Sequence, residues 1–269
     1  MQAGDSTQRF SDRVADYLRW RPPYPPEIVG FLVEQTNLTR EWAIADLGSG
    51  TGLTSRLFLD HGNRIFGVEP NREMRQAAEE LFAENPLFTS VAGSAEETTL
   101  AARSVELVAA GQAFHWFDPD RARAELERIL KPGGWVTLIW NDRRKTSTPL
   151  LRAYEELLQT WAIDYREVDH TRIGGSEIES FFAPGGIVTT SFDNRQSFDC
   201  EGFEGRLLSS SYAPAAGHPS HEPMIESLRS IFDTHQTNGQ VTIEYDTRVY
   251  LGRLGKSGTG TNSLLTPPG

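Results

Sequence analysis

A short apolar run, an acidic residue and three closely spaced glycines occur together between Ala43 and Gly52. Asp46 stands at the end of the apolar run, and Gly48, Gly50 and Gly52 follow at alternate positions. The pattern predicts a buried strand, a sharp turn and a helix that starts just after the last glycine. Glycine suits such a turn because it adopts unusual backbone angles and lets a ligand approach the main chain closely. These residues are therefore candidates for ligand binding.

A second acidic residue, Glu69, ends the run Arg64–Glu69, which reads as the next strand. It follows the glycine turn by about twenty residues, where a carboxylate is placed to accept both hydroxyls of a ribose. Two ligands fit this arrangement, a dinucleotide and S-adenosylmethionine. Dinucleotide loops space their last two glycines three apart, so that the third packs helix against strand and the helix end faces the pyrophosphate. Here the glycines are two apart.

The order of Asp46 and the glycines resembles the first motif of the class I S-adenosylmethionine-dependent methyltransferases. The resemblance implies that the loop seats the methionine part of the cofactor S-adenosylmethionine and that Glu69 holds its ribose. The loop residues concerned are Asp46, Gly48, Ser49, Gly50 and Gly52. A nicotinamide-dependent oxidoreductase, a non-catalytic protein that binds S-adenosylmethionine and a ligand-free turn remain as alternatives.

Two further stretches extend the resemblance on the adenine side. Gly93-Ser94-Ala95-Glu96 follows a short strand predicted over 88–92 and matches the family's third motif, which implies that Ser94, Ala95 and Glu96 hold the adenine. A strand-end turn would also select small polar residues. Met74, one turn into a helix predicted over 71–84, is placed to touch the adenine edge, although a methionine there is also typical of ordinary core.

The fourth predicted strand, Val105–Ala109, leads into Gln112-Ala113-Phe114-His115-Trp116. This string resembles the Gln-Ala-x-His-Trp sequence of the type 11 small-molecule methyltransferases. The resemblance implies that Gln112, Ala113 and Phe114 line the methionine side of the cofactor. His115 is the candidate catalytic base, which methyl transfer needs only where the acceptor still holds its proton. The alternative is that His115 and Trp116 form a structural pair in the pocket wall.

Several other transferase chemistries do not fit the stretch after the fourth strand. Adenine and glutamine N-methyltransferases carry Asn or Asp before Pro-Pro and an aromatic residue there, whereas this chain has Gly-Gln-Ala-Phe. Cytosine C5 enzymes need a nucleophilic cysteine at that place, and Cys200 lies far along the chain. Metal-dependent catechol enzymes place acidic metal ligands there. This chain has none in Gly111–Phe117, so we predict no metal site.

Candidate substrate residues come from the first forty residues and from the later strands. The stretch Tyr17–Pro25, YLRWRPPYP, resembles the cap of a group that includes trans-aconitate methyltransferases, which implies that Tyr17 and Arg21 face the pocket. These aromatics equally suit packing of the helix onto the domain. Trp116 and Asn141 complete the candidates, since Asn141 follows the strand predicted over 135–140 at the edge where open α/β sheets bind ligands.

The alternation of strand and helix from residue 43 onward predicts the fold class. We expect an α/β, Rossmann-like, seven-stranded sheet with helices on both faces, parallel except for the last strand over 241–251. An N-terminal helical cap should occupy 1–40 and the methyltransferase domain 41–254, with a helical lid insertion at about 145–184. The segment 255–269 should be a flexible tail.

Composition limits the partners of the protein. The 269 residues carry 37 acidic and 26 basic side chains, a formal net charge of −11, without a basic stripe, so nucleic acid is a disfavoured partner. The single cysteine, Cys200, excludes internal disulfides, and no apolar run has the length of a membrane span. The first ten residues lack an apolar signal core. We expect a soluble cytoplasmic protein; the sequence leaves monomer and homodimer open.

The expected function is methyl transfer from S-adenosylmethionine to a small-molecule acceptor, with a lean toward a carboxylate or hydroxyl oxygen. Arginines near the expected pocket suit a carboxylate partner, although they are equally typical of solvated surface: Arg19, Arg21, Arg143 and Arg144. An aromatic or quinone-like acceptor fits the aromatic residues of the same segments, which are Trp20, Tyr24, Trp161 and Tyr165.

Overall fold

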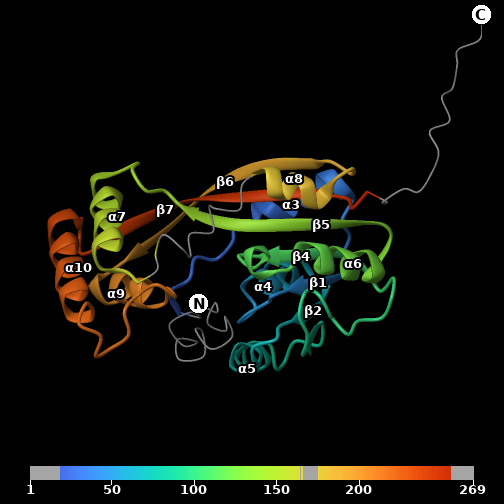
Figure 1. Ribbon diagram of the computed structural model, residues 1–269, viewed down its shortest axis with the longest axis horizontal. Helices are drawn as coiled ribbons and strands as arrows, with labels where there is room; N and C mark the ends of the chain where they lie inside the picture. The colour runs from blue at the N-terminus through green and yellow to red at the C-terminus, as the bar shows by residue number, and fades with distance from the viewer. Residues whose placement is uncertain (1–18, 164, 166–174, 256–269) are drawn as a thin grey trace, which may run out of the picture.

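The computed structural model describes residues 19–163, 165 and 175–255. Its core is one seven-stranded sheet in the order β3-β2-β1-β4-β5-β7-β6 (Figure 1). The strands are β1 (Ala43–Leu47), β2 (Arg64–Val68), β3 (Phe88–Val91), β4 (Val105–Gly111), β5 (Leu130–Arg143), β6 (Ile187–Phe198) and β7 (Val241–Gly252).

Strand directions confirm the predicted α/β sheet. The pairs β1–β2, β2–β3, β1–β4 and β4–β5 are parallel, whereas β7 runs antiparallel to both of its neighbours, β5 and β6. The chain order reverses between β1 and β4, which lie side by side in the middle of the sheet. Ligands of open α/β sheets bind outside the carboxyl ends of the strands at such a reversal.

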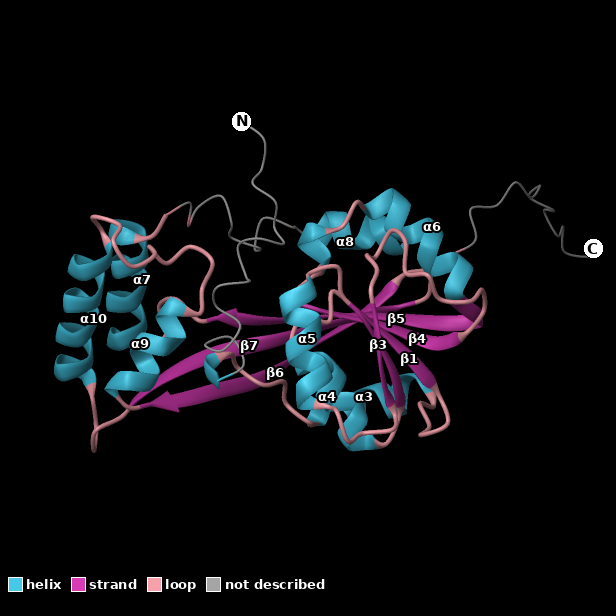
Figure 2. Ribbon diagram, turned by 90° about the horizontal axis from the view of Figure 1, so that it is seen from below, coloured by secondary structure: helices cyan, strands magenta, loops and turns pink. Residues whose placement is uncertain are grey.

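Helices cover both faces of the sheet, as expected (Figure 2). On one face, α3, α4 and α5 bury residues such as Ile28, Leu32 and Phe58; on the other, α6 and α8 bury residues such as Leu126 and Phe182. The helices described are α3 (Glu27–Thr36), α4 (Leu53–His61), α5 (Arg72–Leu81), α6 (Pro119–Ile129), α7 (Pro149–Trp161), α8 (Gly175–Phe182), α9 (Cys200–Leu208) and α10 (His221–His235), with a 3₁₀ turn, η1 (Phe114–Trp116).

Local sequence explains where these helices start. The side chains of Asn71, Asp118 and Thr148 accept hydrogen bonds from the third residue of α5, α6 and α7 respectively, which satisfies one of the free amide groups at each helix start. Pro119 and Pro149 follow the last two caps at the first helical position, where a missing amide hydrogen costs nothing. The starts of these three helices are therefore encoded locally.

β5 starts earlier than the expected position of Trp135. It begins at Leu130, and its register against β4 jumps from Val105↔Leu130 to Leu107↔Trp135. The Lys-Pro-Gly-Gly stretch is thus a bulge within the strand, with Gly133 at a φ of 79°. Lys131 pairs with Glu106, the residue of β4 that faces the bulge.

The segment expected to form the lid, 145–184, divides in the structure. α7 packs with α9, α10 and the ends of β6 and β7 in a separate apolar cluster, at the end of the molecule where β6 and β7 extend beyond the other strands (Figure 1). α8 instead packs against α6 on the sheet. The sequence reasoning did not anticipate α9, which lies between β6 and β7. We call α7, α9 and α10 together the helical lid.

Candidate functional site

Two adjoining cavities open at the carboxyl edge of the sheet, where β1 and β4 end. One is lined by the turns after β1, β2, β3 and β4; the other lies between the turn after β1, the linker before α3, the end of β5 and the helical lid. We call them the inner cavity and the lid cavity. Both share one set of lining residues, which are Gly48, Gly50, Gly111, Gln112 and Trp116. The two spaces therefore meet at the point of strand-order reversal.

Glycine is required at two positions of this shared wall. Gly48 has a φ of 64°, and a Cβ added there would lie 2.7 Å from the Cβ of Ala113. A Cβ on Gly111 would lie 2.0 Å from the Thr54 hydroxyl oxygen. A larger residue at either position would push the turns after β1 and β4 apart. Gly52 lines neither cavity, and its close neighbour is the ring of Phe82.

Asp46 lies beneath the glycine turn and lines neither cavity. Its side chain is completely buried, and Oδ2 accepts a hydrogen bond from the Ser55 hydroxyl at 2.7 Å. Oδ1 has no hydrogen-bond partner among the described residues. Burial, outweighing the Ser55 hydrogen bonds, raises the pKa of Asp46 to about 7. A buried carboxylate with an open oxygen is suited to the polar, cationic end of an amino acid ligand.

Glu69 lines the inner cavity and holds the glycine turn to β2. Its Oε2 accepts from the Gly50 amide at 2.9 Å, and its Oε1 accepts from the Asn71 amide at 2.8 Å. Burial raises the pKa of Glu69, while those amide hydrogen bonds oppose the shift. Asn71 in turn caps α5 through the Met74 amide. One carboxylate therefore organises two turns and keeps an edge in the cavity.

The residues predicted for the adenine end come together around the same cavity. Met74, Ser94, Ala95 and Glu96 all line it. Met74 and Ala95 are buried. Glu96 accepts a hydrogen bond from the Asp118 amide at 2.9 Å, which ties the turn after β3 to the start of α6.

The string after β4 splits between wall and core. Gln112 and Ala113 line the inner cavity, and Gln112 also lines the lid cavity with a φ of 55°, an uncommon value for a residue with a side chain. Its amide group donates to the Asn141 carbonyl oxygen at 3.0 Å. Phe114 lines neither cavity and packs against Phe181 with ring centroids 4.7 Å apart. Its predicted contact with the cofactor has no counterpart in this geometry.

His115 and Trp116 stand at the mouth of the cavities, in the turn η1. Their rings contact each other, with centroids 4.7 Å apart. His115 lines the lid cavity, and Trp116, 42% exposed, lines both cavities. His115 therefore reaches the lid cavity, where a base could act, and its contact with Trp116 also fits a structural pair.

The structure places the predicted substrate residues in different surroundings. Tyr17 lies outside the described residues. Arg21 lines the lid cavity and donates to the Ser209 carbonyl oxygen at 2.9 Å. Asn141 also lines it, but its side chain donates to the Pro22 carbonyl oxygen at 3.1 Å and accepts from the Thr247 hydroxyl at 2.5 Å. Asn141 therefore fastens the linker before α3 to the sheet.

Of the other arginines named from the sequence, only Arg143 lines a cavity. Arg19 pairs with Glu201, and Arg144 pairs with Asp193 and Asp246, all away from the cavities. Arg143 lines the lid cavity, where it forms an ion pair with Glu155. Its Nη2 also donates a hydrogen bond to the Tyr165 hydroxyl at 3.1 Å. Trp20 lies against Gly205 of α9 rather than in the cavity, so it packs the cap onto the lid.

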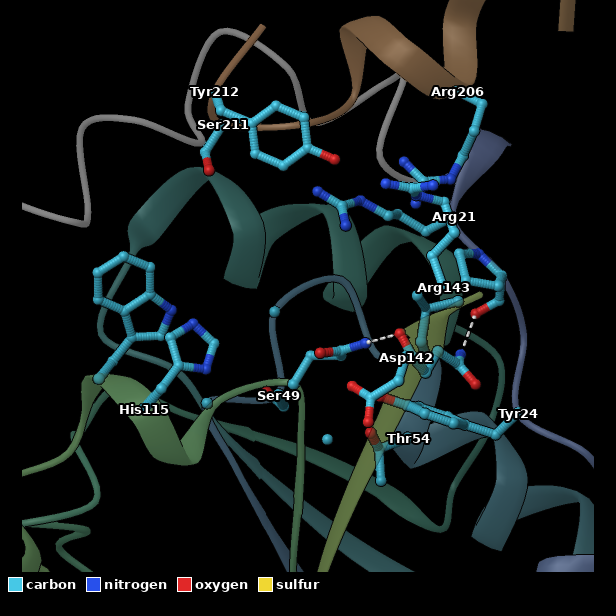
Figure 3. Close-up of a pocket in the computed structure, with 18 of the residues that line it drawn as sticks. Arg21, Tyr24, Ser49, Thr54, His115, Asp142, Arg143, Arg206, Ser211 and Tyr212 are labelled. Carbon is cyan, nitrogen blue, oxygen red and sulfur yellow. Dashed lines mark hydrogen bonds between the residues drawn. The ribbon is translucent and has the colours of Figure 1, made fainter. Parts of the chain in front are cut away.

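Arg206 and Tyr212 are among the residues of the lid cavity that the sequence reasoning did not name. Figure 3 shows the side chains of Arg21, Arg143 and Arg206 gathered with Tyr212 on one side of the pocket, away from His115. The signal for Arg206 was its spacing from Phe203 and Leu207, which puts all three on one face of a helix. That face is buried in the structure.

Residues 45–138 match a family model described as a methyltransferase domain. The matched segment runs from β1 into β5 and contains the turns that line the inner cavity. Over this segment the chain is similar to methyltransferases. The helical lid, with Arg206 and Tyr212, lies outside the matched segment.

Curated relatives support the same family. The chain is 37% identical over 151 residues to an uncharacterized methyltransferase of Schizosaccharomyces pombe, an alignment that covers 56% of this chain and 59% of the relative. It is 40% identical over 140 residues to one of Mycobacterium tuberculosis, which covers 52% of this chain and 54% of the relative. The matched stretch thus spans little more than half the length of these curated relatives.

Solved structures confirm the fold. A protein from Anaeromyxobacter dehalogenans, provisionally assigned as a type II methyltransferase, aligns with a TM-score of 0.67 and 22% identity over 87% of this chain and 98% of its own. A provisionally assigned methyltransferase from an antibiotic biosynthesis pathway of Anabaena variabilis aligns with a TM-score of 0.62 and 21% identity over 88% and 99% of the two chains. None of the described helices is long and apolar enough to span a membrane.

Proposed function

We propose that this protein transfers the methyl group of S-adenosylmethionine to an oxygen of a small molecule. The observation that carries the proposal is the shared wall of the two cavities, formed by Gly48, Gly50, Gly111, Gln112 and Trp116. A methyl donor in the inner cavity and an acceptor in the lid cavity would meet there. In-line displacement depends above all on such alignment.

The residues around the inner cavity fit S-adenosylmethionine. S-adenosylmethionine supplies an electrophilic methyl group on a sulfonium. Glu69 would bind the ribose, Met74 and the 94–96 turn would hold the adenine, and the glycine turn with Gln112 and Ala113 would seat the methionine end. Asp46 lies below that turn with Oδ1 open among the described residues. A cationic ligand end near it would favour its ionised form, against the burial that raises its pKa to about 7.

The acceptor oxygen decides whether His115 has a chemical role. In the transfer, the sulfur–methyl bond breaks with its electron pair left on sulfur, and an oxygen–methyl bond forms. A carboxylate acceptor has no proton to lose and needs no base. A hydroxyl acceptor must give up its proton, and His115 at the wall of the lid cavity is placed to take it.

The dinucleotide alternative has weaker support. The glycines stand two apart, and Gly52, which would occupy the place of the helix-packing glycine, contacts the Phe82 ring. A dinucleotide would also extend toward a second nucleotide site, whereas the lid cavity on that side is lined by arginines and tyrosines.

Calorimetric titration of the full chain with S-adenosylhomocysteine tests the proposal, with NAD and NADP as parallel controls. We expect a single site for S-adenosylhomocysteine and no heat from either dinucleotide. Binding of a dinucleotide instead would replace the proposal with an oxidoreductase. Binding of S-adenosylhomocysteine without methyl uptake by any acid or phenol would leave a non-catalytic binding protein.

A further inference from the structure

Arg206 is a buried cation at the wall of the lid cavity. It is 5% exposed, and it stands on α9 facing the strand β7. Its Nε donates to the Tyr245 hydroxyl at 3.0 Å, and its Nη1 donates to the Ser210 hydroxyl at 3.0 Å. Nη2 makes no hydrogen bond to a described residue, although Arg206 lines the cavity. One donor edge of the guanidinium is thus available to a ligand.

Within the described part of the chain, Arg206 has no carboxylate at ion-pair distance. Its neighbour in the cavity, Arg143, shows the contrast, because Arg143 pairs with Glu155. Burying a charge without an opposite charge is costly, and an apolar side chain of similar length would be the cheaper choice for packing alone. The missing partner of Arg206 is therefore expected to come from the ligand.

The surroundings keep the cavity positive. Burial acts to lower the pKa of Arg206, but the nearby phenols of Tyr245 and Tyr154 outweigh it and raise the pKa, so the guanidinium stays charged. Burial likewise acts to raise the pKa of Tyr212, yet Arg206 and Arg143 outweigh it and lower the pKa. The lowered pKa of this phenol reflects the positive potential that the two guanidiniums set up on this side of the cavity.

An anionic group bound by Arg206 is poorly suited to be the group that is methylated. A carboxylate loses its negative charge as the oxygen–methyl bond forms, so a guanidinium bound to it would stabilise the substrate more than the transition state. Arg206 also lies on the opposite side of the lid cavity from His115 (Figure 3), and it does not line the inner cavity. The anionic group that Arg206 binds and the oxygen that is methylated are thus different groups of the acceptor.

We infer that Arg206 binds an oxyanion of the acceptor other than the atom that is methylated. The acceptor is then a small organic acid that carries a second oxygen nucleophile, and the fixed anion sets which oxygen faces the methyl donor. Carboxylate and phosphate share the chemistry that Arg206 recognises. The inference rests on the proposed methyl transfer and makes Arg206 the residue that selects acidic acceptors.

Calorimetry with the full chain saturated with S-adenosylhomocysteine tests the inference. The probes are malonate, succinate and glutarate as diacids, monomethyl succinate as a product-like monoacid, glycerol 3-phosphate as the phosphate, and succinamide as the neutral control. We expect wild type to bind at least one diacid and monomethyl succinate, and not succinamide. Glycerol 3-phosphate in place of the diacids would assign the oxyanion as phosphate.

Variants then locate the binding. Arg206→Met should weaken the binding of the acid by about 10- to 100-fold, the usual effect of removing charge-assisted hydrogen bonds. Arg206→Lys should recover part of it, and Arg144→Gln, which removes a cation from surface pairs nearby, should leave it unchanged. In methyl-uptake assays, Arg206→Met should raise KM for acids far more than it lowers kcat.

Several outcomes overturn the inference. The first is that wild type binds none of the acids. The second is that Arg206→Met binds the acids as tightly as wild type does. The third is that Arg206→Met loses the binding of diacids but keeps that of monomethyl succinate. S-adenosylhomocysteine binding, measured in each variant, serves as the check of folding, because Arg206 does not line the inner cavity. If wild type does not bind S-adenosylhomocysteine, the proposed function is wrong. If wild type binds it but acid binding does not depend on Arg206, only this inference is wrong.

Discussion

The two cavities carry opposite charge. Carboxylates surround the inner cavity, where Glu69 and Glu96 line the wall and Asp46 lies beneath the turn. Arginines gather in the lid cavity, where Arg143 is matched by Glu155 and Arg206 has no carboxylate partner among the described residues. A cationic methyl donor suits the first environment and an anionic acceptor suits the second. The difference teaches that charge can sort two ligands that must meet.

The two regions also differ in how they are assembled. The inner cavity consists of turns that follow consecutive parallel strands, all within residues 48–117. The lid cavity joins the linker before α3 to the end of β5 and to α9, through contacts such as Arg21 to Ser209, 188 residues apart. The predictions below separate the two regions, beginning with the largest expected effect.

The pH dependence of stability should expose the buried carboxyl of the inner region. The pKa of Asp46 is 3.8 in the unfolded chain and about 7 in the folded one. Between these values the folded state holds a proton that the unfolded state has lost. The contribution of Asp46 to stability is therefore full below its unfolded pKa and is lost as pH rises through its folded pKa. The loss from this group should reach up to about 4 kcal/mol. Denaturant unfolding of the ligand-free chain across this range measures it.

The matched variant for this slope is Asp46→Asn. It removes the titrating group, so the part of the pH dependence that belongs to Asp46 should vanish. An unchanged slope would move the effect to another group, with Glu69 the first to examine because its pKa is also raised.

Gly48→Ala should weaken S-adenosylhomocysteine binding by about 100-fold or more. The substitution forces a side chain into the left-handed backbone region and against Ala113. Gly239→Ala is the control, since Gly239 has a similar φ of 76° but open space around it. If calorimetry gave both variants the affinity of wild type, the glycine turn would not contact the cofactor.

Glu69→Ala should weaken the same ligand by about 10- to 100-fold, because a carboxylate that accepts strong hydrogen bonds is lost together with its hold on the Gly50 amide. Acid binding in the lid cavity should remain near the wild-type value. Glu84→Ala, on the exposed surface, serves as the control. Unchanged affinity in calorimetry would remove Glu69 from the cofactor site.

His115→Ala should have the smallest effect, a fall in kcat of less than about tenfold, if the methylated oxygen belongs to a carboxylate. Methyl-uptake rates across pH measure it with the acid that binds best. A fall of a hundredfold or more, together with loss of one limb of the pH profile, would instead assign a hydroxyl acceptor with His115 as its base.

Local sequence was enough to predict the inner cavity. Glycine spacing, the strand-ending Glu69 and the string after β4 each lie in a turn at the carboxyl edge of a parallel strand, so their grouping follows from the sheet alone. The misplacements at this edge were matters of side-chain direction. Phe114 points into the core, where its ring packs against Phe181. Gly52, which has no side chain, leaves the room that the Phe82 ring occupies.

Sequence reasoning failed where distant elements pair. It left Arg206 unnamed because α9 was not expected, and it treated Arg19 and Arg144 as candidates equal to Arg143. It began the fifth strand at Trp135, since a proline and two glycines normally end regular structure, whereas the structure absorbs them as a bulge opposite Glu106.

The sequence by itself determined the sheet, its one antiparallel strand and the residues of the turns around the inner cavity, because these follow from local periodicity and from glycines at fixed positions. Only the tertiary structure decided which arginines line the lid cavity. Whether a charged side chain is solvated, paired or left open in a cavity depends on what packs beside it. For Arg206 that is the end of β7 and the linker before α3, both far away along the chain.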